Sequence, residues 1–444
     1  MNPHKMRFRD INSLAIPSII AGISEPLLSL VDTAIVGNVD SNAIQALAAV
    51  GIAGSFIASI VWILGQTRTA ISSIIAQYVG MNALDKIRTL PGHVMAINIG
   101  LGLFLYGLTV LMVQYIFQWY NAEGLILEYA VSYYKIRAIG LPFSLFVFTI
   151  YGIFSGLQNT LIPMLISVTG VLVNIVLDVV FVYGIPGYFE GMHIEGAAYA
   201  SVIAQIIMAV MGILMYLKKT SFPLFIKSPF HKEIKRIASL SFNLFVRSLS
   251  LNVAIYLSNS YATSYGASYI AAQTICFQIW MFFSFFVDGY ASVGSIVAGK
   301  LKGIGELLSL EILLRDLLKY AVVVAFILSC LCFVFYESLG LVFTSDTMVL
   351  EVLSEVLWLV LITQPLNAIA FVFDGVFKGL AEAVVLRNTV AAATFLGFVP
   401  ALLISDSFGL KLFSVWIAFS IWMFLRSSIL WVYFKRNANT LLAL

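Results

Sequence analysis

The chain has 444 residues, of which 61% are apolar and only 11% are charged, with a net charge of +3. Soluble domains average about 45–50% apolar and ~25% charged residues, so this composition excludes an ordinary soluble enzyme or nucleic-acid-binding domain. The apolar residues occur in runs of about 20 or more, long enough to cross the ~30 Å hydrocarbon core as helices. The sequence therefore predicts an all-α integral membrane protein, with membrane lipids around it and no nucleic-acid partner.

Twelve transmembrane helices are predicted from these runs. In chain order they cover residues 11–37, 46–76, 93–119, 129–156, 161–185, 195–217, 236–263, 268–298, 318–342, 350–377, 384–405 and 409–434. The first run is too long, and holds too many charges and prolines, for a cleavable signal. An even number of spans places both termini on the same side of the membrane.

The basic residues decide which side this is. With the N-terminus in the cytoplasm, 19 of the 25 basic residues fall on inner segments and only Lys135, Arg137 and Lys411 fall at outer ends. Cytoplasmic segments carry an excess of Lys and Arg, so both termini are predicted to be cytoplasmic. No transit peptide is evident, which favours the inner (plasma) membrane of a prokaryote.

The longest polar connection, residues 218–235, separates two halves of equal span number. We interpret it as a cytoplasmic linker between an N-lobe (residues 1–217, spans one to six) and a C-lobe (residues 236–444, spans seven to twelve). Six is even, so both lobes insert in the same direction. Such parallel repeats are related by a pseudo-two-fold axis along the membrane normal, and substrate sites commonly lie between them.

An internal repeat supports this division. At an offset of 223 residues, the following residues fall on identical ones: Pro142 on Pro365, Phe148 on Phe371, Gly152 on Gly375, Phe154 on Phe377, Gly156 on Gly379 and Leu157 on Leu380. Proline and glycine are not the residues that a hydrophobic bias would favour. The pattern indicates a duplicated six-helix unit, and the duplication makes a monomer sufficient.

Two carboxyl groups lie inside the N-lobe spans. Asp32 is near the outer end of span one, and Asp178 is at a similar depth in span five, one turn after Asn174. Inserting an ionisable group into hydrocarbon costs at least ~2.5–3.5 kcal/mol. Such a residue is therefore expected to have either an interaction partner or a function inside the membrane. Two acids and an amide at one level predict a proton or Na⁺ site, because burial and like-charge proximity favour the protonated form. The alternative is a structural pair of acids bound by hydroxyl or backbone donors.

The C-lobe carries a different set of charges. Arg247 in span seven, Asp288 in span eight and Asp374 in span ten all fall in the inner half of the bilayer. One base among two acids suggests an ion-paired cluster, which acts either as structural support or a gate, or carries protons directly. Neither acid has an acidic counterpart at the offset of 223, so the lobes have diverged in chemistry.

Span one contains further features. Glu25 lies on the same helix face as Asp32, and Pro17 and Pro26 are expected to interrupt the helix, because proline removes a backbone hydrogen bond. Broken helices near a binding site are common in transporters, and a static kink is the alternative. Two other intramembrane arginines, Arg68 and Arg426, lie near inner ends and are expected to snorkel.

Several polar residues within spans are candidates for lining a cavity. They are Glu25, Tyr151, Gln66, Gln273 and Gln278. Taken singly, each also fits an interhelical hydrogen bond. The three cysteines lie inside apolar runs without the spacing of a metal site or a disulfide framework.

Six segments resemble the multidrug and toxic compound extrusion (MATE) family. In the N-lobe they are EPLLSLVDTAIVG (25–37), GLQNTLIPM (156–164) and VNIVLDVVFVYG (173–184); in the C-lobe they are FVRSLSL (245–251), IAAQTICFQIWMFFSFFVDGYA (270–291) and QPLNAIAFVFDGVFKG (364–379). The C-lobe segments resemble the DinF-like branch of this family. The resemblance covers nearly the whole chain, and the segments occur in the family's order.

The resemblance implies roles for particular residues. Asp32 and Asp178 would be the essential acids of a cation site with Asn174 beside them, and Pro17 would be where span one bends on protonation. Ser201 is the best match to a hydroxyl expected on span six. Arg247, Asp288 and Asp374 match charged residues of the DinF-like branch. Members export cationic amphiphiles, organic anions or natural products, driven by H⁺ or Na⁺.

The predicted function is a secondary antiporter that exports small organic, amphiphilic and cationic compounds in exchange for H⁺ or Na⁺, with no cofactor. A flippase or exporter of a lipid-linked or natural-product substrate is the alternative. An intramembrane aspartyl protease is disfavoured because both N-lobe acids lie toward the outer face, and the sequence has no phosphate-binding loop for an ATP-driven pump. The chain is therefore not predicted to be an enzyme.

Overall fold

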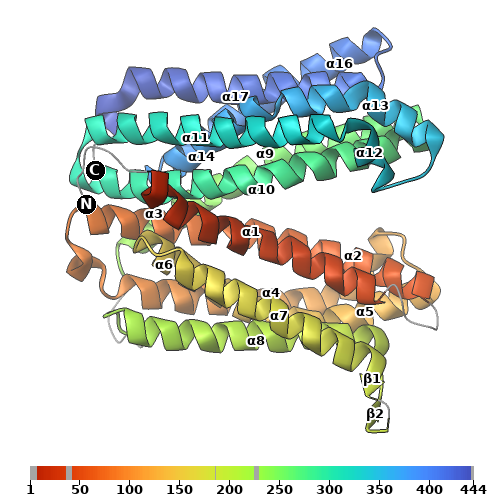
Figure 1. Ribbon diagram of the computed structural model, residues 1–444. Helices are drawn as coiled ribbons and strands as arrows, with labels where there is room; N and C mark the ends of the chain where they lie inside the picture. The colour runs from red at the N-terminus through yellow and green to blue at the C-terminus, as the bar shows by residue number, and fades with distance from the viewer. Residues whose placement is uncertain (1–7, 37–42, 186, 225–229, 442–444) are drawn as a thin grey trace. The chain divides into compact units, whose positions relative to one another are not determined.

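The computed structural model describes residues 8–36, 43–185, 187–224 and 230–441, and these residues are almost entirely helical (Figure 1). The first half contains α1 (Phe8–Val36), α2 (Ala43–Leu64), α3 (Gln66–Gly80), η1 (Leu84–Ile87), α4 (Leu90–Trp119), α5 (Gly124–Arg137), η2 (Ala138–Gly140), α6 (Leu141–Gly156), α7 (Leu161–Tyr183), the strands β1 (Gly184–Ile185) and β2 (Phe189–Glu190), and α8 (His193–Lys219). The second half contains α9 (Glu233–Tyr265), α10 (Ala267–Ile304), α11 (Leu307–Val334), α12 (Tyr336–Leu341), α13 (Thr347–Ile362), α14 (Gln364–Gly379), α15 (Ala383–Ala392), the π-helical turn η3 (Ala393–Phe398), α16 (Val399–Ser407) and α17 (Leu412–Leu441).

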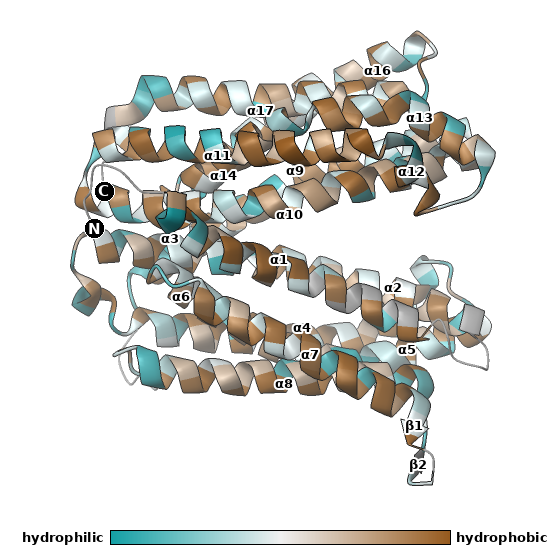
Figure 2. Cartoon of the chain, in the orientation of Figure 1, coloured by the Kyte–Doolittle hydropathy of each residue, from teal (hydrophilic) through white to brown (hydrophobic). Residues whose placement is uncertain are grey.

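The helices match the predicted spans closely. Among the described residues, ten helical stretches are long and apolar enough to cross a membrane, and the bent pair α13 and α14 forms an eleventh. The remaining predicted span coincides with α1, which is 29 residues long. Apolar residues run along the helices and hydrophilic ones gather mostly toward their ends (Figure 2). The predicted all-α membrane architecture is therefore confirmed.

The ninth span shows the largest difference from the prediction. Its helix α11 begins at Leu307 rather than at residue 318. The helix therefore includes the charged residues Glu311, Arg315 and Asp316, which precede the predicted start of the span. Acidic and basic residues four apart support a helix, so a charged first part of a span is as helical as its apolar remainder.

The chain divides into two compact units. The N-terminal unit comprises Ile20–Ile75 and Ala83–Ala238, and the C-terminal unit comprises Ser239–Leu444 together with the short segments Met1–Ile19 and Ala76–Asn82. Each unit has its own apolar core. In the N-terminal unit Tyr134 and Phe117 are fully buried, and in the C-terminal unit Trp416 and Trp422 are almost completely buried.

Glycines allow helices to approach closely at repeat-related positions. In the N-terminal unit, a Cβ on Gly152 of α6 would lie 2.5 Å from the carbonyl oxygen of Arg68 on α3. In the C-terminal unit, a Cβ on Gly375 of α14 would lie 2.0 Å from the carbonyl oxygen of Ala291 on α10. The offset of 223 relates Gly152 to Gly375 and also Arg68 to Ala291. The duplication is therefore visible in the contacts as well as in the sequence.

A second glycine pair extends the same pattern one turn further. Gly156 faces the carbonyl oxygen of Ser72, and Gly379 faces that of Ser295, and the offset of 223 again relates both partners. Within the C-terminal unit, Gly80 faces the carbonyl of Lys300 while Gly303 faces that of Gln77. The offset of 223 relates Gly80 to Gly303 and Gln77 to Lys300. Each glycine therefore contacts the repeat equivalent of the other glycine's partner, which is the reciprocal pattern of contacts about a two-fold axis.

Both units break a span at equivalent prolines. In the N-terminal unit α5 and α6 are separated by η2, and Pro142 follows in the first turn of α6. In the C-terminal unit α13 and α14 meet at an angle of 48°, and Pro365 lies in the first turn of α14. Proline is tolerated in the first turn of a helix because its missing N–H would be unpaired there anyway. The repeated proline thus fixes where each span restarts.

We expect Gly375→Ala to lower the thermal unfolding midpoint of the purified protein, because its added methyl group would overlap the Ala291 carbonyl. Overpacking of this kind costs about 1–3 kcal/mol. The control is Gly100→Ala, at a position on α4 where a Cβ meets nothing within 4 Å. That change should leave the midpoint unchanged or raise it, since alanine is the better helix former. Equal effects of the two changes would contradict close helix packing at Gly375.

Candidate functional site

A chain of hydrogen bonds joins three helices of the N-terminal unit. The side-chain amide of Asn174 on α7 donates to Ser201 Oγ on α8 at 3.3 Å, and this hydroxyl donates to Asp32 Oδ2 on α1 at 3.2 Å. All three residues are buried, with Asn174 at 0% and Asp32 at 5% exposure. The structure thus brings together three of the predicted coupling residues from spans one, five and six.

Asp178 completes this group. It follows Asn174 by one turn of α7, is 0% exposed and interacts electrostatically with Asp32. Asp32 Oδ1, Asn174 Oδ1 and both carboxyl oxygens of Asp178 accept no hydrogen bond from an N–H or hydroxyl donor among the described residues, and the two carboxyl groups lie close enough to share a proton. Unpaired buried oxygens are suited to receive a proton or a hard cation, which prefers oxygen ligands.

Two neighbours of this site were not selected from the sequence. Arg137 and Tyr133 lie one turn apart on α5, and both interact electrostatically with Asp32 and Asp178. From the sequence, Arg137 was predicted only to be one of the basic residues at outer ends of spans. The sequence does contain a signal for this pair. Residues four apart lie on one face of a helix, which places Tyr133 beside Arg137.

The C-terminal unit contains a buried ion-pair cluster. Asp374 Oδ2 on α14 accepts hydrogen bonds from Arg247 on α9 and from Arg426 on α17. The three residues are 6% exposed or less. The Arg426 guanidinium also lies 4.9 Å from the centre of the Trp422 ring. One carboxylate therefore links three helices of this unit.

The expectation that Arg426 snorkels is wrong, because its side chain is 2% exposed and pairs with Asp374. Asp288, which we grouped with Arg247 and Asp374, is exposed and is not joined to the arginine pair by a hydrogen bond in the described structure. Lys378 lies one turn after Asp374 on α14 and interacts electrostatically with Asp288 and both arginines. It was counted only among inner basic residues in the sequence.

Helix α1 is continuous through both of its prolines. Pro17 is buried and Pro26 is exposed, and the helix has no assigned break between Phe8 and Val36. A break at either proline is therefore not seen in this conformation, and bending of the helix at Pro17 or Pro26 stays a prediction. The Glu25 side chain lies outside the described residues.

The other predicted cavity residues have different surroundings. The Tyr151 hydroxyl pairs with Ser167 Oγ at 2.7 Å, and Gln273 Oε1 accepts from the Trp416 indole at 2.9 Å. Both bonds are buried and join different helices of one unit. Gln66 is half-buried and bonds to a backbone carbonyl of its own chain segment at 3.4 Å, whereas Gln278 is exposed.

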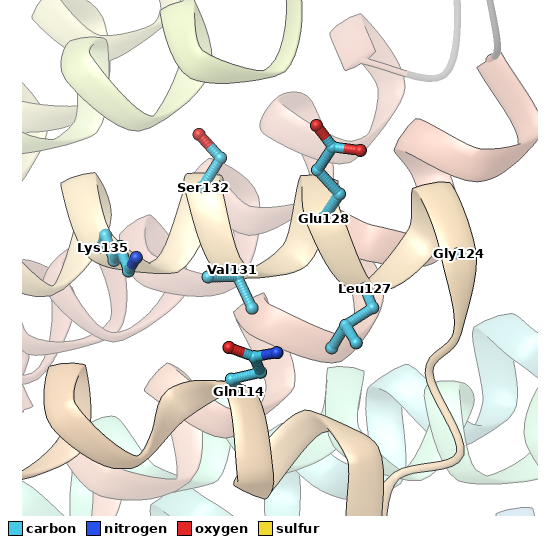
Figure 3. Close-up of a pocket in the computed structure, with 7 residues that line it drawn as sticks. All are labelled: Gln114, Gly124, Leu127, Glu128, Val131, Ser132 and Lys135. Carbon is cyan, nitrogen blue, oxygen red and sulfur yellow. The ribbon is translucent and has the colours of Figure 1, made fainter.

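A groove between α4 and α5 has a volume of about 430 Å³. Gln114 of α4 points toward Val131 and Leu127 of α5, and Glu128 and Lys135 line the same space (Figure 3). Neither carboxyl group of the Asp32 site lines it. We therefore assign the groove no part in the coupling site.

The MatE family model matches residues 17–180 and 244–403, which include Asp32, Asp178, Arg247 and Asp374 and most of both halves of the chain. The chain belongs to the MATE family. The two matched stretches correspond to the duplicated units, and the predicted family relationship is confirmed. MATE proteins are transporters, and the many apolar helices agree with a multi-pass membrane member.

Named MATE relatives cover most of the chain. DNA damage-inducible protein F of Escherichia coli is 26% identical over 96% of this chain and 91% of its own length. Multidrug resistance protein NorM of Photobacterium profundum is 26% identical over 88% of the chain and 86% of its length. Protein DETOXIFICATION 42 of Arabidopsis thaliana is 29% identical over 67% of the chain, which spans 56% of that relative.

Solved MATE structures share the fold. A crystal structure of MATE in the bent conformation has a TM-score of 0.90 at 22% identity and covers 98% of this chain and 96% of its own. The outward-facing conformation of a multidrug resistance MATE family transporter has a TM-score of 0.87 at 22% identity, covering 97% and 96%. At these identities the comparison establishes the fold alone.

We expect Asp374→Asn to destabilise the protein by about 3–5 kcal/mol, because two buried arginines would lose their shared counter-charge. The unfolding free energy or the thermal midpoint in detergent measures this. Asp288→Asn makes the same chemical change at an exposed position of the same unit and should leave stability nearly unchanged. A stable Asp374→Asn protein would show that the arginines have other partners.

Proposed function

We propose that this MATE protein is a secondary antiporter that exports organic amphiphilic compounds in exchange for H⁺ or Na⁺. The proposal rests on one observation: Asp32 and Asp178 are buried side by side, and several carboxyl and amide oxygens of the group have no N–H or hydroxyl donor among the described residues. Two neighbouring acids repel each other when both are charged and contribute little to holding three helices together, so a cation that comes and goes is the better explanation. We place the protein in the inner (plasma) membrane with both termini in the cytoplasm, as the basic residues favour.

Binding of the coupling ion would act through the charge of this group. A proton or Na⁺ neutralises the acids and removes the penalty of keeping a charge in hydrocarbon. The hydrogen bond from Ser201 to Asp32 links α8 to α1, so neutralisation changes a contact between helices. Coupling then follows if the two access states bind the ion with different affinity.

Helix α1 is the element that we expect to respond. It carries Asp32 near one end and Pro17 and Pro26 within its length, and proline lacks the hydrogen bond that resists bending. Related MATE structures are described as bent and as straight. We propose that ion binding at Asp32 shifts α1 between two such forms.

The energy available fits transport against a gradient. One charge moving through 100 mV supplies about 2.3 kcal/mol. At about 1.4 kcal/mol per tenfold change, one or two ions sustain a gradient of tens- to about a thousandfold. The acidic pair favours a cargo that includes a cationic group.

The first test is efflux from proteoliposomes under an imposed pH gradient or an imposed Na⁺ gradient, with rhodamine 123 as a fluorescent organic cation. We expect one gradient to drive transport, and Asp32→Asn and Asp178→Asn each to abolish it, because neither can then release and rebind the ion. Glu190→Gln is the matched control, since it neutralises an exposed acid of the same unit.

The outcomes separate the alternatives. Transport driven by pH alone assigns the pair to H⁺, and transport driven by Na⁺ alone assigns it to a metal ion. Transport by neither gradient, with both variants equal to wild type, would contradict the antiporter and make flipping of a lipid-linked substrate the next assay.

A second prediction concerns Ser201. Ser201→Ala removes the only hydroxyl that bridges Asn174 and Asp32 among the described residues, and the lost bond to a charged group is worth about 1.5–3 kcal/mol. We expect the apparent affinity for the coupling ion to change about tenfold or more. Ser201→Thr keeps the hydroxyl and should behave like wild type in the same efflux assay. Equal affinities for wild type and Ser201→Ala would argue against this hydrogen-bond chain.

A further inference from the structure

The groove between α4 and α5 carries polar side chains that the coupling site does not use (Figure 3). Gln114 of α4 and Glu128 and Lys135 of α5 are exposed along it, and the apolar side chains of Leu127 and Val131 also line it. Within the described part of the chain, the three polar side chains take part in no hydrogen bond or ion pair. A groove of this composition is open to a ligand from outside the chain.

The groove lies at a membrane surface. α5, η2 and α6 form one span of 33 residues, which begins at Gly124. At 1.5 Å per residue this span is about 50 Å long, whereas the hydrocarbon core is ~30 Å thick and the bilayer with its headgroups is ~40–45 Å thick. The excess length places the first turns of α5, which line the groove, among lipid headgroups.

Exposed aromatic and apolar side chains indicate that the groove faces lipid. Tyr115 and Trp119 of α4 are 65% and 80% exposed, and Leu111, one turn before Gln114, is 81% exposed. Tyrosine and tryptophan gather where the hydrocarbon meets the headgroups, and an exposed leucine deeper in the membrane is suited to contact acyl chains. A lipid beside α4 would therefore place its headgroup at the groove.

The two charges of the groove have opposite signs and a defined order. Glu128 and Lys135 are seven residues apart, so they lie on one face of α5 and about 10 Å apart along its axis. Glu128 is nearer the start of the helix at the membrane surface, and Lys135 is nearer the hydrocarbon. A zwitterionic phospholipid has the same order, because its phosphate adjoins the glycerol and its ammonium lies beyond the phosphate. The flexible lysine stem extends toward the surface and shortens the gap between the two charges.

A further acid beside the groove makes an anionic lipid unfavourable. Ser132, which lines the groove, donates a hydrogen bond to Glu195 of α8. Two carboxylates, Glu128 and Glu195, therefore lie near one lysine. A lipid with only a phosphate would meet an excess of negative charge, whereas a lipid that also carries an ammonium would reduce this excess.

We propose that this groove binds one phospholipid whose headgroup carries a primary ammonium, namely phosphatidylethanolamine. Its phosphate pairs with Lys135, and its N–H groups donate to Glu128 and to Gln114 Oε1. A quaternary ammonium has no N–H to donate, so a choline lipid fits less well. The opposite face of α5 presents Tyr133 and Arg137 to the coupling site, so the lipid binds to the same helix without entering that site.

Native mass spectrometry of the purified full-length protein tests this proposal. Palmitoyl-oleoyl lipids with ethanolamine, choline or glycerol headgroups, which have identical acyl chains, are titrated into the protein in detergent. The dissociation constant of the first bound lipid is measured for each. We expect the ethanolamine lipid to bind about tenfold more tightly than the choline lipid, the ratio that one additional charge-assisted hydrogen bond supplies. The glycerol lipid, which is anionic, should bind most weakly.

Single substitutions locate the site. Glu128→Gln should abolish the preference for the ethanolamine lipid over the choline lipid. Lys135→Gln should weaken the binding of both, because both contain the phosphate, and Lys135→Arg should retain it. Glu123→Gln is the matched control, since it neutralises an exposed acid at the same end of α5 that does not line the groove, and it should keep the preference. Thermal midpoints equal to that of wild type confirm that each variant is folded.

Other results would overturn the proposal. Equal binding of the three lipids by wild type, or tightest binding of the glycerol lipid, would show that the groove does not recognise the ammonium. An unchanged preference in Glu128→Gln would show that the lipid binds elsewhere on the chain. The measurement needs neither an ion gradient nor a transported compound. A failure here therefore leaves the antiport proposal intact, and a failure of the efflux test leaves the lipid site intact.

Discussion

The hydrocarbon interior requires every buried polar group to find its partner inside the protein, and this requirement shapes the rest of the structure. Helices satisfy the backbone, and close helix contacts are made where glycine allows them. Charged side chains must be paired or neutralised locally. Among the described residues, the charge of Asp374 is compensated by two arginines, whereas Asp178 lies beside a second acid, Asp32, and accepts no hydrogen bond from an N–H or hydroxyl donor. Such an exception points to a ligand that binds and leaves.

The duplicated glycines explain how the same framework supports different chemistry. Gly152 and Gly375 each allow close contact with a backbone carbonyl of the equivalent neighbouring helix, and a carbonyl does not depend on side-chain identity. Because these contacts use backbone atoms, the side chains around them are free to diverge. Arg68 and Ala291 occupy equivalent positions in the two units, and the acid Asp374 stands where the other unit has Tyr151. Backbone contacts therefore maintain the fold, and the side chains of the same helices determine the chemistry.

The sequence predicted the spans because hydropathy and helix length are local properties, and it placed Asp32, Asn174 and Asp178 together because depth and one-turn spacing follow from helix geometry. Ser201 came from the family resemblance, since no local pattern marks it. The pairing of Arg426 with Asp374 was missed because it depends on how α17 and α14 are rotated against each other. The continuity of α1 through its prolines was also missed, since proline permits a bend without requiring one.

The two units have opposite charge balances. The N-terminal site gathers two acids with one arginine nearby, whereas the C-terminal cluster gathers three cations around one buried acid. The helix contacts of the repeat are shared, so this difference lies in the side chains. The proposed coupling cation would shift the equilibrium between conformations only by its difference in affinity for the two states. The C-terminal cluster, in which cations outnumber the acid, does not favour a cation, so coupling is expected to begin in the N-terminal unit.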